Sequence, residues 1–458
     1  MSAPRSQRLL DPLFTTEKMR EIFSDRGRLR GMLDFEAALA RAEARAGMLP
    51  AAAAKAIGAE CREDRFDVDA LAGATALAGN PAIPLVRELT TRVAASDAEA
   101  ARFVHWGATS QDAMDTGLVL QLRSALDVID ADLARLSAAL ASLARKHACT
   151  PLAGRTWLQQ GPPVTLGLKV AGWFSAVERH RERIARARSA VATLQFGGAV
   201  GTLAALSEHG LSVAEALAAE LKLTLPDLPW HAQRDRIAEV ATALGLLVGT
   251  LGKIARDVSL LMQTEIAEAL EPGAPGGGGS STMPHKRNPV GSAVMLAAAA
   301  RVPALVATML GAMVQEHERG LGGWHAEWET LPEICMLSAG ALARGVEIVE
   351  GLEVDARRMA ADLDITHGLI MGEAVSMALA AHLGRQGAHE LVERACARAV
   401  QERKHLREVL AADSRVTKHL SETELDRALD PARYTGQAEA FVARALAGGA
   451  EAGKKKKR

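Results

Sequence analysis

The segment from Gly273 to Ser292 has the composition of a site that acts on a carboxylate. It reads GAPGGGGSSTMPHKRNPVGS and places two serine hydroxyls before a histidine, a lysine, an arginine and an asparagine. Lys286 supplies a point charge and Asn288 supplies an amide donor, a combination that suits a carboxylate. Serine is a poor base at neutral pH, but cations and backbone N–H groups can stabilise its alkoxide. The alternative is that the segment is a flexible surface loop.

A helix is expected to begin directly after this segment. Pro289 suits the start of a helix, and Asn288 before it suits the N-cap position. The N-terminal end of a helix attracts anions, so this helix would add to a carboxylate site. The P-loop pattern, in which a lysine and a serine or threonine follow the last glycine, is absent from the sequence. The glycines therefore do not indicate a nucleotide phosphate.

A second polar patch reads HWGATSQDAMDTG and begins at His105. It groups this histidine with Thr109, Ser110 and Gln111, just before a long apolar repeat. The two hydroxyls and the adjacent N–H groups could hold a second carboxylate. Thr109 or Ser110 could also be the N-cap of the following helix, with Asp112 in its first turn. Both interpretations can hold together.

A third patch reads GRTWLQQGPPVTLG and begins at Gly154. Arg155 and Thr156 could bind a substrate, and Trp157 could form the wall of a pocket. A proline-marked turn with a packed tryptophan explains the same residues equally well. Taken by itself, the patch does not separate these two interpretations.

Neither the histidines nor the cysteines are spaced like metal ligands. The histidines and acids that come closest to a cluster are His317, Glu318, His325 and Glu327. Their spacing does not match the HExxH pattern of a zinc helix, so no metal is expected. The four cysteines lie far apart without a CxxC pair, as expected for reduced thiols in the cytoplasm.

Strong helical periodicity surrounds the polar patches. Apolar residues recur at spacings of three and four along residues 122–143 and 237–261, which puts one apolar seam along each helix. The proline-free stretch 234–270 could form one helix of about 50 Å. Its three glycines between residues 245 and 252 are tolerable if neighbouring helices approach closely there. No strand pattern is comparably strong, so we predict an all-α fold.

We predict three helical domains, at residues 1–115, 116–360 and 361–458, of which the second holds a bundle of long helices. The chain ends in KKKKR, which is expected to be a disordered basic tail. The net charge of -1 indicates neither a nucleic-acid nor a membrane partner. The N-terminus lacks a secretory signal, and the longest apolar stretch, 241–252, is shorter than the roughly 20 residues of a membrane span. A cytoplasmic protein is expected.

Together, the three patches resemble the fumarase/aspartase superfamily, which includes adenylosuccinate and argininosuccinate lyases. GSSTMPHKRNP resembles the signature loop of that superfamily, and the other two patches resemble its first and second sequence blocks. QRDRIAEV at 233–240 and HER at 317–319 resemble adenylosuccinate lyase in particular. The resemblance covers about residues 10–445. It implies a three-domain helical fold and a homotetramer whose active sites draw loops from three subunits.

The chemistry that this resemblance implies is addition or elimination next to a carboxylate. By resemblance, Ser280 exchanges the proton at Cα, while Lys286 and Asn288 hold the carboxylate that takes up the charge. The residues implied to contact the substrate are His105, Thr109, Ser110, Arg155, Thr156, Trp157, Gln233, His285 and Arg319. No metal or organic cofactor is implied, because the carboxylate and protein cations stabilise the carbanion.

Departures from adenylosuccinate lyase narrow the expected reaction. That enzyme carries a histidine at the position of Trp157 and its glutamate partner at the position of Ala293. Such a pair protonates a leaving amine or hydroxyl, whereas a carboxylate, with a reference pKa of roughly 4, leaves without a proton. Trp328 also replaces an arginine. The pattern resembles the lactone-forming cycloisomerases of the superfamily, in which a carboxylate of a small tricarboxylate adds across a double bond.

Two alternatives are weighed against a cycloisomerase. The first is an elimination enzyme of the adenylosuccinate lyase type, which Trp157, Ala293 and Trp328 disfavour. The second is a non-catalytic structural protein on the same scaffold, as a lens crystallin of this superfamily exemplifies. The intact Ser280 and Lys286 disfavour that alternative. A turnover assay separates the two classes.

Overall fold

The structure, a computed structural model, describes residues 9–273, 283 and 286–455. Within these ranges helices dominate and the strands are short, which confirms the predicted all-α fold. The chain divides into two compact units. The first unit combines residues 1–133, 180–252 and 294–344, and the second unit combines residues 134–179, 253–293 and 345–458. The division into three domains at residues 115 and 360 stays a prediction.

Five long helices each contribute residues to both units. They are α7 (Ser110–Lys146), α8 (Leu166–Val191), α10 (Asp235–Leu261), α11 (Val290–Gly311) and α12 (Gly323–Gly351). The apolar seams predicted along α7 and α10 are buried, and no residue of either seam is more than 8% exposed. The helical period of the sequence was therefore a reliable guide to the buried face of both helices.

α10 is shorter than the proline-free stretch would allow. It ends at Leu261, whose carbonyl accepts a hydrogen bond from the N–H of Glu268. The chain then forms β3 (Ala269–Leu270), which pairs antiparallel with β4 (Glu353–Val354). The single helix considered for residues 234–270 is thus corrected, because pairing with a distant strand takes the place of the last helical turns.

The first unit brings α10 and α11 close together. A Cβ atom added to Gly245 would lie 2.9 Å from a side-chain atom of Val306, and one added to Gly252 would lie 2.7 Å from that of Ala299. The close approach expected at the glycines of α10 is therefore confirmed at these two positions. Gly249 has open space around its Cα atom.

By length and composition alone, α10 and α11 could each cross a membrane, which the sequence analysis did not anticipate. The core helix of a globular protein passes the same test, and the most apolar window of α10 is 61% buried within this chain. The corresponding window of α11 is 28% buried. α11 therefore keeps much of its apolar surface uncovered in the single chain.

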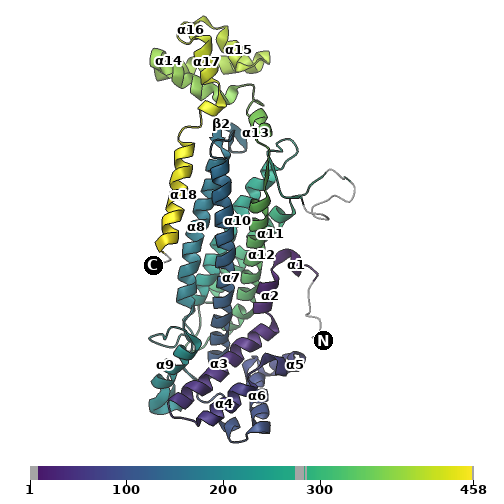
Figure 1. Cartoon of the computed structure of the whole chain (residues 1–458), viewed down its shortest axis with the longest axis vertical. Helices are drawn as coiled ribbons and strands as arrows, with labels where there is room; N and C mark the ends of the chain where they lie inside the picture. Colours follow the sequence, from purple (N-terminus) through teal and green to yellow (C-terminus); the bar gives the residue numbers. More distant parts are fainter. Residues whose placement is uncertain (1–8, 274–282, 284–285, 456–458) are drawn as a thin grey trace. The chain divides into compact units, whose positions relative to one another are not determined.

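The first unit is also built around α3 (Asp25–Arg45), which packs against α4 (Ala51–Glu60) and α9 (Gly210–Leu221) (Figure 1). α3 buries two acids, Glu36 and Glu43, on the same face as its apolar residues. The remaining elements of this unit are α1 (Asp11–Phe14), α2 (Glu17–Ile22), α5 (Val68–Ala78), α6 (Ala82–Ser96) and the 3₁₀ helices η1 (Glu63–Arg65), η2 (Ala100–Phe103) and η3 (Ala204–His209).

A β-hairpin in the second unit is formed by the third polar patch, for which the sequence offered a proline-marked turn as one of two interpretations. β1 (Pro151–Thr156) pairs antiparallel with β2 (Gln159–Thr165). Trp157 and Leu158 make the turn, and both have left-handed backbones, with φ of 54° and 64°. Two-residue turns of this kind favour asparagine and glycine, so neither residue signals a hairpin in the sequence.

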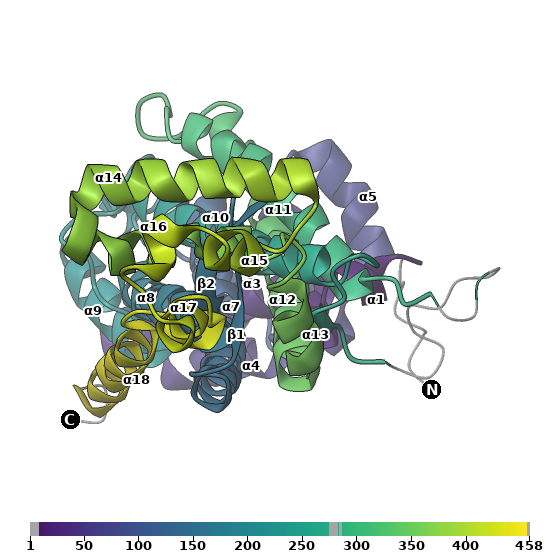
Figure 2. The ribbon, with the colours of Figure 1, turned by 90° about the horizontal axis from the view of Figure 1, so that it is seen from above.

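A separate apolar core fills the C-terminal part of the second unit. α14 (Gly372–Glu402) bends at Gly384 and packs with α15 (Leu406–Ala411) and α17 (Glu422–Ala428) (Figure 2). The other elements are α13 (Ala356–Asp362), η4 (Leu369–Met371), α16 (Ser414–Thr417), η5 (Pro431–Arg433) and α18 (Ala438–Lys455). Because α18 continues to Lys455, the basic run expected to be disordered begins inside a helix, and residues 456–458 lie outside the described residues.

Candidate active site

Arg319 lies directly against Thr109 in the first unit. Its Nη2 is 3.3 Å from the Thr109 hydroxyl oxygen and also donates to the carbonyl of Ala199 at 3.1 Å. Its Nε donates to Oε1 of Gln111 at 2.8 Å. Two residues that the sequence placed in the site, Arg319 and Thr109, are thus brought together from positions 210 residues apart.

Gln111 holds the guanidinium of Arg319 in place. The side chain is completely buried, and its Nε2 donates to Asp115 at 3.0 Å and to the carbonyl of His231 at 2.9 Å. Because both acceptors require the NH₂ end of the amide, Oε1 must face Arg319. A buried amide with all of these partners cannot turn without leaving polar groups unpaired. Gln111 therefore fixes the position of Arg319 above Thr109.

Asp112 holds together the backbone around Thr109. Thr109 occupies the N-cap position of α7, since its carbonyl accepts from the N–H of Asp112 at 2.9 Å. The hydroxyl of Thr109 faces Arg319. The Asp112 side chain completes the cap instead, because its carboxylate accepts a hydrogen bond from the backbone N–H of Thr109 at 3.0 Å. The completely buried Asp112 carboxylate also accepts from Gln195 Nε2, Gly197 N, Gly198 N and His231 Nε2.

A buried charge cluster supports this arrangement. Arg234 donates to Asp115 at 2.7 and 3.0 Å and to Glu327 at 3.0 Å. Burial opposes the charge of Arg234, but both carboxylates outweigh it and raise the pKa of the guanidinium. Glu327, one of the acids weighed as a metal ligand, is thus engaged with a cation. The side chain of Gln233, predicted to bind substrate, is exposed.

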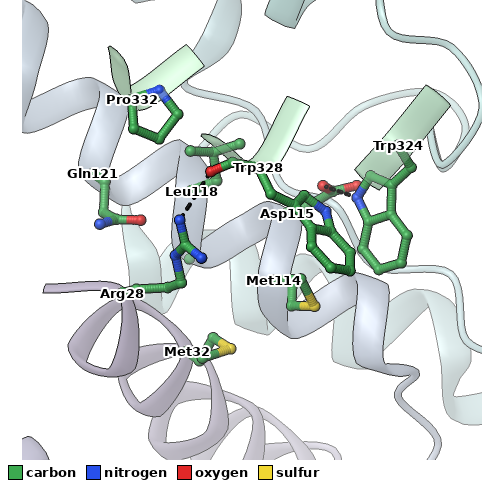
Figure 3. A pocket seen from close by; sticks show the side chains of 10 residues that line it. Arg28, Met32, Met114, Asp115, Leu118, Gln121, Trp324, Trp328 and Pro332 are labelled. Atoms are coloured by element: carbon green, nitrogen blue, oxygen red, sulfur yellow. Dashed lines mark hydrogen bonds between the residues drawn. The ribbon is translucent and has the colours of Figure 1, made fainter. Parts of the chain in front are cut away.

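A pocket beside the charge cluster is lined by residues of α3, α7 and α12 (Figure 3). Its apolar lining consists of Met32, Met114, Leu118, Trp324, Trp328 and Pro332. Pro332 has no N–H for the carbonyl of Trp328 one turn earlier, and Arg28 donates to that carbonyl at 2.9 Å. Arg28 is bound to the carbonyl of Trp328 and Asp115 is bound to Arg234, so both charged side chains of this lining already have partners. The pocket is therefore unsuited to a tricarboxylate.

His105 pairs with Glu36 of α3. Its Nδ1 lies 2.6 Å from Oε1 of Glu36, whose side chain is 1% exposed. The backbone of His105 is left-handed, with φ of 59°, a conformation uncommon for residues other than glycine. His105 was predicted to contact a carboxylate of the substrate. In the structure one of its ring nitrogens contacts a carboxylate of the chain itself, that of Glu36.

In the second unit, Arg155 is held by the chain itself. Its two terminal nitrogens donate to the two carboxylate oxygens of Glu268 at 2.8 Å each. Glu268 is completely buried and immediately precedes β3. Arg155 thus ties the hairpin to the end of α10, and its contact with substrate stays a prediction. Trp157, at the hairpin tip, is 98% exposed.

The signature segment is only partly described. Ser280 and His285 lie outside the described residues, while Lys286 is exposed and Asn288 is half-buried. Asn288 was expected to be the N-cap of the next helix. The N-cap is instead Pro289, because its carbonyl accepts the first intrahelical bond, from Ala293 at 2.9 Å, and α11 begins at Val290.

Glu271 fills the start of α11. Its carboxylate accepts from the N–H groups of Gly291 and Ser292 at 2.9 and 2.8 Å, and the residue is 8% exposed. A helix N-terminus favours negative charge, and here an acid of the same chain supplies it. The expectation that this helix end receives the substrate is therefore corrected for these two N–H groups.

Comparison with known proteins places this geometry in a family. Residues 14–304 match the family model described as Lyase. The chain belongs to this lyase family. Residues 368–445 of the chain also match the model described as Adenylosuccinate lyase C-terminus. The expected kinship with the fumarase/aspartase superfamily is confirmed.

Individual relatives match the chain over nearly its whole length. It is 62% identical to 3-carboxy-cis,cis-muconate cycloisomerase of Pseudomonas aeruginosa, over 98% of this chain and 97% of that protein. It is 60% identical to the protein of the same name from Pseudomonas putida, over 92% of this chain and 100% of that protein. The crystal structure of 3-carboxy-cis,cis-muconate lactonizing enzyme from Pseudomonas putida superposes with a TM-score of 0.94 at 59% identity, covering 97% of this chain and 100% of that one.

The acids that hold these side chains within each unit were not identified from the sequence. Asp115 of the first unit and Glu268 and Glu271 of the second were not singled out, and Glu36 was not connected to His105. One signal was available for Glu36, since it stands between Leu33 and Leu39 on the buried face of α3. A buried acid on such a face requires a donor. The identity of that donor is decided by contacts between distant parts of the chain.

Proposed function

We propose that the chain is a 3-carboxy-cis,cis-muconate cycloisomerase that closes its tricarboxylate substrate to a carboxymuconolactone. The observation that carries the proposal is the 62% identity to a relative of that name over 98% of the chain. Trp157 and Ala293 support it, because they leave the positions of the family's leaving-group acid without a proton donor. In the reverse of this reaction the departing group is a carboxylate, which leaves without being protonated.

The reaction is an internal addition in which no atom is lost. A carboxylate oxygen of the substrate bonds to the ring-closing carbon, and the electrons of the double bond move to the neighbouring Cα. Lys286 and Asn288 hold the carboxylate attached to Cα, which takes up the charge as an aci-carboxylate. Ser280 delivers the proton to Cα and regains a proton from solvent, and it is the base in the reverse direction. Trp157 is 98% exposed in the single chain, so its proposed role, to shape the pocket and keep it dry, requires the assembly proposed below.

The corrected start of α11 changes how the negative charge is stabilised. Glu271 occupies the N–H groups of Gly291 and Ser292, so these donors are unavailable to the substrate. In the proposed mechanism, stabilisation therefore falls on the charge of Lys286 and the amide of Asn288. No metal or organic cofactor is required, since proton transfer and charge stabilisation use side chains only.

We further infer a cytoplasmic homotetramer with active sites shared between subunits, working in the protocatechuate branch of the beta-ketoadipate pathway for aromatic degradation. Two observations support an assembly. Trp157 and Leu158 at the hairpin tip are 98% and 76% exposed, although left-handed non-glycine residues cost about 1–3 kcal/mol each and persist mainly at functional sites. α11 also exposes an apolar surface that a neighbouring subunit would cover.

An ultraviolet assay of the purified protein tests the proposal. The protein is mixed with 3-carboxy-cis,cis-muconate, with adenylosuccinate in a parallel cuvette and chelator in both. We expect loss of the diene absorbance in the first cuvette and no change in the second. Turnover of adenylosuccinate alone would contradict the proposal, because it would show that another residue protonates the leaving group in place of the missing pair at Trp157 and Ala293.

The role of Ser280 is tested within the same assay. Ser280→Ala is expected to lower kcat far more than it weakens substrate binding, because the proton transfer occurs only in the transition state. Ser281→Ala is the matched control, as it removes the neighbouring hydroxyl. Near-normal turnover of Ser280→Ala would remove Ser280 from the mechanism.

A further inference from the structure

Glu36 is a buried acid whose side-chain partner in the described part of the chain is His105. The two residues are 69 positions apart, and Glu36 lies on the inner face of α3. A carboxylate is an acceptor only, so Nδ1 of His105 must carry the proton in this 2.6 Å contact. That requirement fixes the orientation of the imidazole ring, and Nε2 carries a proton as well when the ring is in its imidazolium form.

The opposite edge of the ring is available to a ligand. The side chain of His105 is 16% exposed, and its Nδ1 edge is covered by Glu36. Nε2 makes no hydrogen bond within the described part of the chain. His105 also stands four residues before Thr109, whose hydroxyl faces Arg319. The accessible nitrogen therefore belongs to the same polar segment as the predicted substrate ligands.

Charges around the ring favour its protonated form. Burial lowers the pKa of His105, but Glu36 on α3 and Asp112 on α7 outweigh this effect and raise the pKa above its ordinary value. Two other titratable groups face Glu36: the Cys61 thiol and the Glu43 carboxyl, whose pKa values burial and Glu36 both raise. Both groups are therefore neutral at neutral pH and add no charge beside Glu36.

We propose that Glu36 is a positioning residue that orients His105 so that Nε2–H is presented to a carboxylate of the substrate. The inference rests on the proposed function, because it deepens the description of that substrate site. It differs from the histidine–glutamate pair missing at Trp157 and Ala293 in both location and duty. That pair protonates a leaving group, whereas this pair binds and orients a charge.

Kinetics of His105→Asn and Glu36→Gln test the proposal. His105→Asn should raise KM for the muconate about 10- to 100-fold while changing kcat less, since it removes one charge-assisted hydrogen bond. In Glu36→Gln the alkaline fall of kcat/KM should move to lower pH by about one unit, because the imidazolium loses its partner. An unchanged KM in His105→Asn, or lower activity in Glu36→Gln with an unmoved alkaline limb, would overturn it.

Glu43→Gln is the matched control. It alters an acid on the same face of α3, two turns from Glu36, and it replaces a neutral carboxyl by a neutral amide. The alkaline limb should stay where the unmodified protein has it. A limb that moves equally in Glu43→Gln and Glu36→Gln would mean that α3 packing, and not the carboxylate at His105, sets the profile.

A measurement independent of turnover separates this inference from the proposed function. In protein with isotope-labelled histidine, the imidazole resonance that disappears in His105→Asn is followed against pH by NMR. Its midpoint should fall in Glu36→Gln, and it should fall less in Glu36→Asp, which also serves if the glutamine variant does not fold. An unmoved midpoint in both would refute the pairing, whereas absence of muconate turnover in the unmodified protein would refute only the function.

Discussion

The carboxylate of Glu353 accepts two hydrogen bonds from the guanidinium of Arg287, at 2.8 and 2.9 Å. The backbone N–H of Gly273 also donates to this carboxylate, which lowers the pKa of Glu353 together with the stronger effect of Arg287. One acid of β4 therefore contacts both Gly273 and Arg287, on either side of residues 274–286. Asn288 directly follows Arg287, so the contact also positions a predicted ligand of the substrate.

Glu353→Gln is expected to lower kcat/KM for the muconate about tenfold, because one bidentate charge-assisted contact at the end of the segment is lost. The global stability should change by less than about 1 kcal/mol, since the pair is exposed. Steady-state kinetics and thermal unfolding measure the two effects. Glu350→Gln is the control, since it disrupts another exposed pair, with Arg135. An equal loss in both variants would argue against a special role for Glu353.

Gln111→Leu is expected to raise KM about tenfold with a smaller effect on kcat, because Arg319 loses the acceptor that holds its Nε. It should also destabilise the protein by about 1–3 kcal/mol, since Asp115 and the His231 carbonyl lose a buried donor. A double-mutant cycle with Arg319→Gln measures the coupling. If the two effects on KM simply add, Gln111 does not act through Arg319.

Glu43 should make the protein less stable as the pH rises. Burial, assisted by Glu36, raises its pKa from 4.5 to about 9 in the folded chain, and neither carboxyl oxygen has a partner in the described structure. Between these two values the unfolded chain loses the proton that the folded chain keeps. The free energy of unfolding therefore falls by up to about 1.4 kcal/mol per pH unit over this range, and the contribution is constant below it.

Glu43→Gln should remove this slope and raise stability at pH 7 by up to about 3 kcal/mol. Urea unfolding at several pH values and one protein concentration measures the difference between the two proteins. Equal slopes between pH 5 and pH 8 would mean that Glu43 is ionised in the folded protein.

Leu158→Gly should separate the fold of the hairpin from assembly. Glycine adopts the left-handed conformation of this turn position without strain, so the hairpin should be kept or stabilised by about 1 kcal/mol. Removal of the exposed side chain should weaken the proposed tetramer, shifting sedimentation toward smaller species as the protein is diluted. Leu228→Gly is the control, because it removes the same side chain at another position that is 76% exposed. Equal sedimentation of all three proteins would exclude the tip from the interface.

Local pattern was sufficient for some of these features. The spacing of apolar residues predicted the buried seams of α7 and α10, because a helix places every third or fourth residue on one face regardless of its surroundings. The same pattern predicted the all-α fold. Residue type singled out Thr109, and the family resemblance singled out Arg319. The structure brings these two residues into contact.

Other features depended on contacts that local sequence does not encode. α10 ends at Leu261 because the following residues pair with β4, and Trp157 and Leu158 form a turn that their side chains do not favour. Glu271 displaces the expected substrate from the start of α11. Each is a choice of partner between segments distant in sequence. Residue types determined which groups needed a donor, an acceptor or an apolar neighbour. Only tertiary packing decided which group supplied it, because burial penalises any polar group left without a partner.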